Sequence, residues 1–420
     1  MKRKTMSLDE ALETVAGFIT SLSTGVPRAE DRITPGILFS TADDEGLLLD
    51  GETAEKYQEC FTNLIDGIGT EQISPRAIEK LYQKAIMASL DVNKRRQDQS
   101  FADRLDAAIK DLKIALRAKP RSFEIYYPIG GLAPEGLPFV LGNVNFCILD
   151  KEKVNNFCGI PEGLQPSPNR QMINEGILGK PIGIVTMMAT ENVAAKTLAL
   201  KELRLTLDVI NFYSDLPPFS HGFAFLPGDR ERSTVTMLIT SEENKGVGWE
   251  VVGPLILMPL KRLDDIEKER SMGISAVSRM LKEKKGGLQE KLLSAIQWAG
   301  RATTDNRKEE AFLLYAIALE SLILAENEKD ELLYRLRTRT SHLLGEGIES
   351  RKKIYKRLGD LYGIRSQIVH SGKYQVTDSD LGQMRFLTKN CILRVLTEEP
   401  FTSFESIDDL VCWFNDRILE

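Results

Sequence analysis

Two residues near the C-terminal end of the chain, Arg365 and His370, have the types needed to cut RNA without a metal ion. Cleavage that uses the ribose 2′-hydroxyl needs a base to take its proton, and histidine titrates near neutral pH. It also needs a positive donor on the phosphate while negative charge builds up there. Arginine offers a planar fork of N–H groups that stays charged, which suits this task better than lysine. The R-x4-H segment Leu361–Gly372 is therefore the candidate catalytic segment.

The R-x4-H spacing is weak evidence by itself, because Arg337 and His342 repeat it in the same region. Both pairs cannot be the motif. Five positions on a straight helix turn through about 500°, which leaves the two side chains about 140° apart. Convergence would need Arg365 to reach across, or the helix to end near His370, and Gly372 favours such an end.

Glu320, Ser366 and Arg339 are candidate supporting residues. Glu320 lies in an otherwise apolar helical run, and lone charges are seldom buried unpaired. It is predicted to form an ion pair with Arg339 or Arg365, which would orient Arg365 in the second case, or else to belong to the site itself. Ser366 is either an ordinary helical residue or a contact to phosphate.

The residues around the motif are basic, although the whole chain carries a net charge of −6. Ten basic and four acidic residues lie between positions 331 and 373. An RNA-binding surface needs such a local excess, whereas a solvated helix face would also show one. The candidate RNA contacts are Lys352, Lys353, Lys356, Arg357 and Lys373.

Residues 288–420, which carry the motif, are predicted to form an all-α bundle. Short polar or glycine-containing breaks separate apolar helical patterns, as in antiparallel bundles. The predicted helices are 288–301, 308–325, 330–344, 351–371, 378–396 and 407–419.

Three further regions are predicted before the bundle, which gives an α+β fold class for the N-terminal and middle parts. Residues 1–118 are mostly helical, 119–260 form an α+β domain with a small sheet, and 261–287 form a linking helix and a hinge at two glycines. The predicted helices are 8–19 with Ser7 as N-cap, 54–68, 76–116, 192–213 and 262–283. The segment 37–51 is expected to form a loop or short strands. The predicted strands are 122–129, 139–149, 182–187, 222–226, 234–240 and 250–258.

The composition limits the classes of site. Five cysteines without a C-x-x-C pair and three histidines provide little for a disulfide framework or a metal site, so we expect no cofactor and a cytoplasmic location. The N-terminal residues show no signal peptide, and the longest apolar run, 311–325, is too short and too charged to span a bilayer.

Three sequence blocks together resemble ApeA-like HEPN domains. Leu361–His370 is similar to the family's LY-x-IRS-x-IVH signature, Ala311–Leu322 to its helix with an ALE-x-L core, and Leu336–Leu344 to its R-x-x-x-LL helix. The blocks follow the family's order over about a third of the chain. Residues 1–280 resemble no family that we can name.

The resemblance implies that Arg365 and His370 are the catalytic pair, and it leaves Arg337 and His342 as bundle residues. It implies a homodimer that brings two motifs to one cleft. Active members are metal-independent endoribonucleases, many of them in antiviral defence or toxin–antitoxin systems, whereas inactive members bind nucleotides or protein partners as scaffolds.

Three functions follow as hypotheses. The first is an RNA endonuclease, with tRNA as one candidate substrate, and the intact Arg365–His370 pair favours it. The second is a non-catalytic module that binds a nucleotide or a protein. The third places the function in residues 120–260, where no phosphate-binding loop, triad or carboxylate pair supports it.

Overall fold

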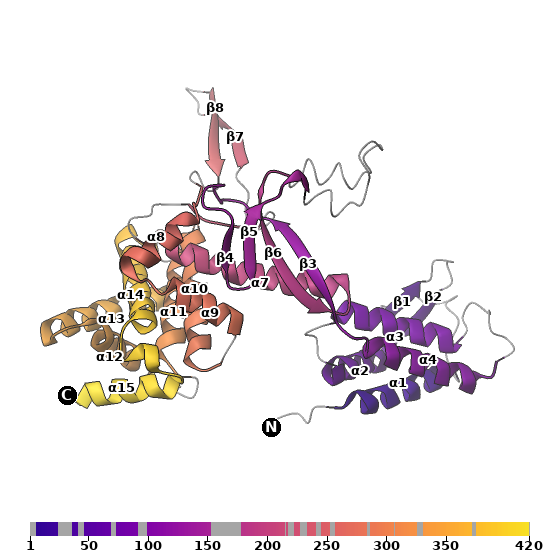
Figure 1. The fold of residues 1–420 in the computed structure, drawn as a ribbon. Coiled ribbons are helices and arrows are strands. Elements are labelled where there is room, and N and C mark those ends of the chain that lie inside the picture. Colours follow the sequence, from indigo (N-terminus) through magenta and orange to yellow (C-terminus); the bar gives the residue numbers. More distant parts are fainter. Residues whose placement is uncertain are drawn as a thin grey trace. The chain divides into compact units, whose positions relative to one another are not determined.

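The chain is mostly helical, with a small four-stranded antiparallel sheet and a helical C-terminal region (Figure 1). It divides into two compact units, Met1–Ile125 with Thr186–Leu200, and Tyr126–Val185 with Lys201–Glu420. The four regions predicted from the sequence are a prediction about which segments fold independently, and that prediction is untested. The computed structural model describes residues 6–23, 36–40, 46–68, 73–90, 99–152, 178–214, 216, 222–226, 233–240, 245–252, 257–283, 286–305, 307–325, 331–371 and 375–419.

The first unit is built from four amphipathic helices around one apolar core. Phe18, Tyr57 and Tyr82 lie at its centre, and the rings of Tyr57 and Tyr82 stack with centroids 4.8 Å apart. A strand pair joins the helices where the sequence predicts a loop or short strands. The elements are α1 (Leu8–Ser23), β1 (Gly36–Ser40), β2 (Gly46–Asp50), α2 (Gly51–Ile68), α3 (Pro75–Leu90) and α4 (Phe101–Leu116).

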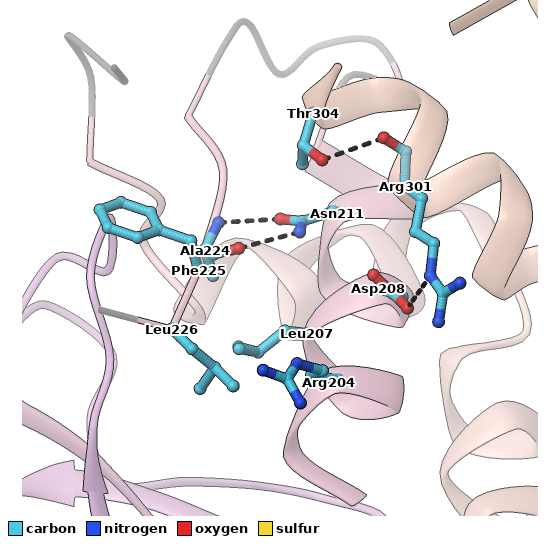
Figure 2. Close-up of a pocket in the computed structure, with 9 residues that line it drawn as sticks. All are labelled: Arg204, Leu207, Asp208, Asn211, Ala224, Phe225, Leu226, Arg301 and Thr304. Carbon is cyan, nitrogen blue, oxygen red and sulfur yellow. Dashed lines mark hydrogen bonds and ion pairs between the residues drawn. The ribbon is translucent and has the colours of Figure 1, made fainter. Parts of the chain in front are cut away.

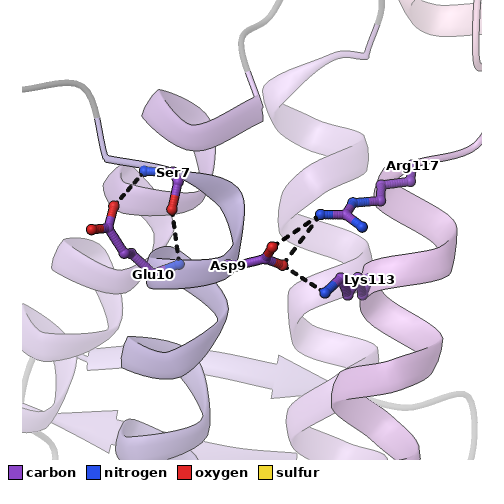
Figure 3. A network of polar contacts seen from close by, with 5 residues as sticks. All are labelled: Ser7, Asp9, Glu10, Lys113 and Arg117. Carbon is purple, nitrogen blue, oxygen red and sulfur yellow. Dashed lines mark hydrogen bonds and ion pairs between the residues drawn. The ribbon is translucent and has the colours of Figure 1, made fainter.

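The start of α1 shows why this helix begins at Leu8 (Figure 3). The Ser7 hydroxyl accepts from the Glu10 amide at 3.3 Å, and the Glu10 carboxylate accepts from the Ser7 amide at 2.7 Å. This reciprocal capping confirms the predicted N-cap. Asp9 forms ion pairs with Lys113 at 2.6 Å and Arg117 at 3.2 Å, which join α1 to the end of α4.

The helical stretch predicted over residues 76–116 contains two helices, α3 and α4. Gln99 and Ser100 are not helical, and the Ser100 hydroxyl accepts from the Asp103 amide at 3.1 Å to begin α4. A serine at this position competes with helix continuation because its side chain satisfies a free amide. Residues 91–98, between α3 and Gln99, lie outside the described residues.

The four-stranded sheet has the order β3 (Arg121–Pro128), β6 (Pro181–Ala189), β5 (Val144–Ile148), β4 (Phe139–Leu141). The predicted run 139–149 is two strands, because Gly142 has φ +58°, which favours glycine at a turn. Phe139 pairs with Phe146, and Val144 pairs with Val185.

Other predicted strands fit only in part. A separate hairpin, β7 (Ser233–Thr240) with β8 (Lys245–Val252), covers the predicted strand at 234–240. The predicted strand at 250–258 overlaps only the end of β8. The segment 222–226 forms an isolated bridge between Phe225 and Gly130 rather than a strand.

Helix α7 (Asn192–Ser214) follows β6, and its residues from Lys201 onward belong to the second unit. Leu203 packs against Gly183 of β6, where a Cβ atom would lie 2.6 Å from the leucine side chain. Farther along α7, the carbonyl of Phe212 accepts from the buried ammonium of Lys389 at 2.6 Å. A positive group is favoured there because the carbonyl end of a helix is negative.

The predicted linking helix over residues 262–283 is two helices, α8 (Lys261–Arg270) and α9 (Ile274–Glu283). Ser271 has φ +48° and Gly273 has φ +78°, so the chain turns between them. The Glu267 carboxylate accepts from the amides of Ile274 at 2.9 Å and Ser275, which caps α9.

The C-terminal helices agree closely with the predicted ones, and Figure 1 shows them grouped in one bundle. Gly287 precedes the first of them with φ +73°. The elements are α10 (Leu288–Thr304), α11 (Lys308–Ile323), α12 (Leu332–Leu344), α13 (Ile348–Ser371), α14 (Asp378–Thr397), the short 3-10 helix η1 (Phe401–Ser403) and α15 (Ile407–Leu419).

Candidate active site

Helix α13 carries the whole Arg365–His370 segment without a break. Leu358, Leu361 and Ile364 are buried, so they fix which side of α13 faces the bundle. The helix ends at Ser371, directly after His370. Both residues lie within the helix, so its end does not bring their two side chains together.

Arg365 faces the bundle and is held by α11. Its Nε lies 3.4 Å from Oε1 of Glu320, and the two side chains are 31% and 26% exposed. Of the two arginines predicted to pair with Glu320, the structure shows this contact for Arg365. Arg339 is buried, donates to the Ile323 carbonyl at 3.0 Å and has a structural position.

Tyr362 is a member of this cluster that sequence reasoning missed. Its hydroxyl donates a hydrogen bond to the Glu320 carboxylate that also pairs with Arg365. Burial and the negative charge of Glu320 raise the pKa of Tyr362, so the phenol keeps its proton and remains a donor. The three-residue spacing of Tyr362 and Arg365 indicates a shared helix face, but nothing local identifies Glu320 as the partner.

His370 lies apart from this cluster. It is exposed, as is Ser366, and it projects about 140° around the helix from Arg365. Within the part of the chain that the structure describes, no hydrogen bond or ion pair joins His370 to Arg365. One chain therefore presents the proposed base on one side of α13 and the proposed phosphate donor on another.

The competing pair, Arg337 and His342, has packing contacts. Arg337 Nε donates to the Tyr355 carbonyl at 2.9 Å, and its guanidinium lies 3.9 Å from the centroid of the Tyr355 ring. A side chain at Gly359 would bring a Cβ atom within 2.8 Å of that guanidinium. Burial and neighbouring arginines lower the pKa of His342, which favours its neutral form inside the bundle.

The basic residues of α13 are not equivalent. Lys352, Lys353 and Lys356 are exposed, and Lys352 pairs with Glu349 at 2.9 Å. Arg357 forms an ion pair with Asp380 of α14 at 2.7 Å. That contact engages Arg357 in packing α13 against α14. The fifth predicted contact, Lys373, lies outside the described residues.

Lys356 and His370 share a face of α13, which the sequence argument did not recognise. Fourteen positions correspond to almost four full turns, so the two side chains project within about 40° of each other. Gly363 lies between them and is also exposed, with open space where a Cβ would be. This exposed stripe of α13 is defined by Lys353, Lys356, Asp360, Gly363, Gln367 and His370.

A metal site and a membrane span were also looked for among the described residues. No group of three or more His, Cys, Asp or Glu side chains among those residues is placed to hold a metal ion. None of the described helices combines the length and apolar character needed to cross a bilayer. Comparison with protein-family models, with curated proteins and with solved structures gives no match to this chain.

Proposed function

We propose that this chain is a metal-independent endoribonuclease of HEPN type in which Arg365 and His370 act on the RNA phosphate. The observation that carries the proposal is the orientation of Arg365 by Glu320 on the same helix that ends at the exposed His370. The three sequence blocks that resemble ApeA-like HEPN domains support the same function.

The proposed chemistry is an internal transfer of the phosphate. His370 takes the proton from a ribose 2′-hydroxyl, and the 2′-oxygen attacks the adjacent phosphorus. The bond from phosphorus to the 5′-oxygen breaks, and that oxygen takes up a proton. The products carry a 2′,3′-cyclic phosphate and a 5′-hydroxyl. Arg365 stabilises the charge that builds up on the phosphate oxygens.

A homodimer explains how the two groups could meet. In one chain they project about 140° apart on α13, so a second chain has to supply one of them to a shared cleft. The partner would approach the His370 end of the exposed stripe, where Gly363 leaves open space, and its own Arg365 would have to reach that end from the other side of its α13. RNA would then lie along Lys352, which is exposed outside the stripe, and along the part of Lys353 and Lys356 that the partner leaves uncovered.

The second candidate is a non-catalytic module that binds a nucleotide or a protein partner. The Glu320–Arg365 ion pair favours it, because the carboxylate offsets the positive charge that a reacting phosphate would need. Catalysis by the first candidate therefore requires that the terminal guanidinium nitrogens of Arg365 reach the phosphate while Nε stays beside Glu320.

The wider role is also a proposal from the resemblance. We place the protein in the cytoplasm, acting in antiviral defence or in a toxin-like role. Total tRNA is a suitable first substrate because it presents many exposed single-stranded loops, where RNA is most accessible.

The decisive experiment incubates the purified protein with total tRNA and determines the end groups of the fragments. Wild-type protein and the His342→Ala variant should produce 2′,3′-cyclic phosphate and 5′-hydroxyl ends, and His370→Ala should produce none. His342→Ala is the matched control because it removes the same residue type from the second R-x4-H pair. Fragments with 5′-phosphate ends, or equal cleavage by His370→Ala, would refute the proposal.

A further inference from the structure

A cavity of about 290 Å³ lies within the second unit, between α7, α10 and the segment 222–226 (Figure 2). Arg204 and Asp208 come from α7, and Arg301 comes from α10. Leu207 and Leu226 contribute apolar walls. None of these residues has a part in the proposed RNA cleavage.

Close backbone contacts define the walls of this cavity. A Cβ atom at Gly300 would lie 1.9 Å from the Asp208 carbonyl oxygen, so α7 and α10 touch through their backbones. The Asn211 side chain accepts from the Ala224 amide at 2.8 Å and donates to the Ala224 carbonyl at 2.9 Å. Figure 2 shows both bonds joining α7 to the extended segment. The cavity is therefore preformed.

Arg301 is held in a defined orientation. Its Nε donates to Oδ2 of Asp208 at 3.0 Å, and its guanidinium lies 5.1 Å from the centroid of the Trp298 ring. The Asp208 side chain is 13% exposed, and burial raises its pKa to about 6 although Arg301, Gln297 and Arg204 oppose the shift. A carboxylate that is costly to ionise is thus kept in place by its ion pair with Arg301.

The charges of the cavity favour an anion. Arg204 and Arg301 carry two positive charges against one negative charge on Asp208. Guanidinium groups match the oxygen spacing of phosphate, which can accept from two of them at once. Leu207 and Leu226 offer an apolar surface beside them.

We propose that this cavity binds a small organic phosphate. Its phosphate group contacts the guanidinium groups of Arg204 and Arg301, and its apolar body lies against Leu207 and Leu226. Asp208 orients Arg301 and limits the net positive charge. The proposal does not depend on RNA cleavage, because the cavity and the Arg365–His370 segment share no residue.

Calorimetric titration of the full chain at pH 8 and low salt tests this site, with adenosine monophosphate as the probe. Arg204→Gln should weaken its binding roughly tenfold or more, since a hydrogen bond to a charged group is lost. Lys201→Gln is the matched control, because it removes the same charge from an exposed position of the same helix outside the cavity. It should change the dissociation constant less than about twofold.

Asp208→Asn should change the affinity for adenosine monophosphate in the opposite direction. The amide oxygen can still accept from Arg301, but the variant lacks the negative charge, so adenosine monophosphate should bind several-fold more tightly. Unchanged or weaker binding by this folded variant would overturn the charge argument. Thermal melting of each variant establishes that it is folded.

Two further probes identify the ligand class. Inorganic phosphate should bind more weakly than adenosine monophosphate, because it has no body to contact the apolar wall. Benzoate should also bind more weakly, because a carboxylate offers fewer oxygens to two guanidinium groups. Equal binding of either probe, absence of adenosine monophosphate binding at millimolar concentration, or equal loss in Lys201→Gln would overturn the proposal.

Discussion

The Nε of Arg365 lies 3.4 Å from Oε1 of Glu320, so a carboxylate of α11 holds the arginine of the R-x4-H segment. The Tyr362 hydroxyl donates to the same carboxylate. One acidic side chain therefore fixes two residues that lie three positions apart on α13.

Glu320 and Tyr362 should act as positioning residues for the proposed cleavage. Glu320→Gln should lower kcat by about tenfold or more because a neutral amide holds Arg365 less firmly than a carboxylate does. Tyr362→Phe, which keeps the ring, should have a smaller effect and lower the free energy of unfolding by about 1 kcal/mol. Steady-state kinetics should show the change in kcat rather than KM. Wild-type kcat in folded Glu320→Gln would contradict this role.

The two R-x4-H pairs should respond differently to substitution. His370→Ala should reduce cleavage by roughly 10²- to 10⁴-fold, the usual effect of a lost general base, and Arg365→Ala by roughly 10²- to 10³-fold, the usual effect of a lost donor to developing negative charge. His342→Ala should change stability by about 1 kcal/mol and leave the products unchanged. EDTA should not inhibit cleavage. Loss of activity in His342→Ala but not in His370→Ala would show that Arg337 and His342, rather than Arg365 and His370, are the catalytic pair.

Dimer formation should depend on the exposed stripe of α13. Light scattering at micromolar concentration should give a dimer for the wild type and a monomer for Gly363→Arg, because the new side chain occupies the open contact surface. Gly382→Arg is the matched control: it also has open space around it in a helix, on α14. A monomeric wild type, or equal effects of both substitutions, would exclude this interface.

Asp208 should make stability depend on pH in a defined direction. Its pKa is raised to about 6 in the fold, so lowering the pH from 7 to 5 adds a proton to the folded state before the unfolded state. The wild type should gain about 1 kcal/mol of unfolding free energy relative to Asp208→Asn across this range. Urea unfolding at both pH values measures the difference. A difference of the opposite sign would mean that the carboxylate is not destabilised by burial.

The hinge predicted at Gly286 and Gly287 concerns independent folding. Limited proteolysis should cleave there if the bundle is a separate domain. The contact of Gly300 with α7 and the bond from Lys389 to Phe212 lead us to expect that fragment 126–420 is more stable than fragment 288–420. Equal melting temperatures for the two fragments would show that α7 adds no stability to the bundle.

The sequence predicts most helices because their limits are local. The helix Ile407–Leu419 is found at its predicted position, and Ser7 identifies the start of α1 through its contact with Glu10. Breaks that depend on distant packing were missed. A Cβ at Gly273 would lie 2.7 Å from Leu396, so the turn between α8 and α9 reflects a neighbour more than one hundred positions away.

In the candidate site, too, local features could be predicted and contacts between distant residues could not. The residue types and spacing of Arg365 and His370 are visible in the sequence, whereas the pairing of Arg365 with Glu320 rather than Arg339 depends on how α11 and α13 pack. The cavity at Asp208 could not be predicted, because its ion-pair partner Arg301 is 93 positions away. Sequence patterns therefore identify the chemistry of a group better than they identify its neighbours.

The contact between Lys389 and Phe212 restricts how the second unit can change shape. Lys389 is 2% exposed, and its ammonium sits against the last turn of α7 at 2.6 Å from the Phe212 carbonyl. If α7 moved away from α14, the buried ammonium of Lys389 would lose its hydrogen bond to the Phe212 carbonyl. Losing a hydrogen bond at a buried charge costs free energy. We therefore expect the last turn of α7 and the middle of α14 to keep the same relative position and to move as one rigid body.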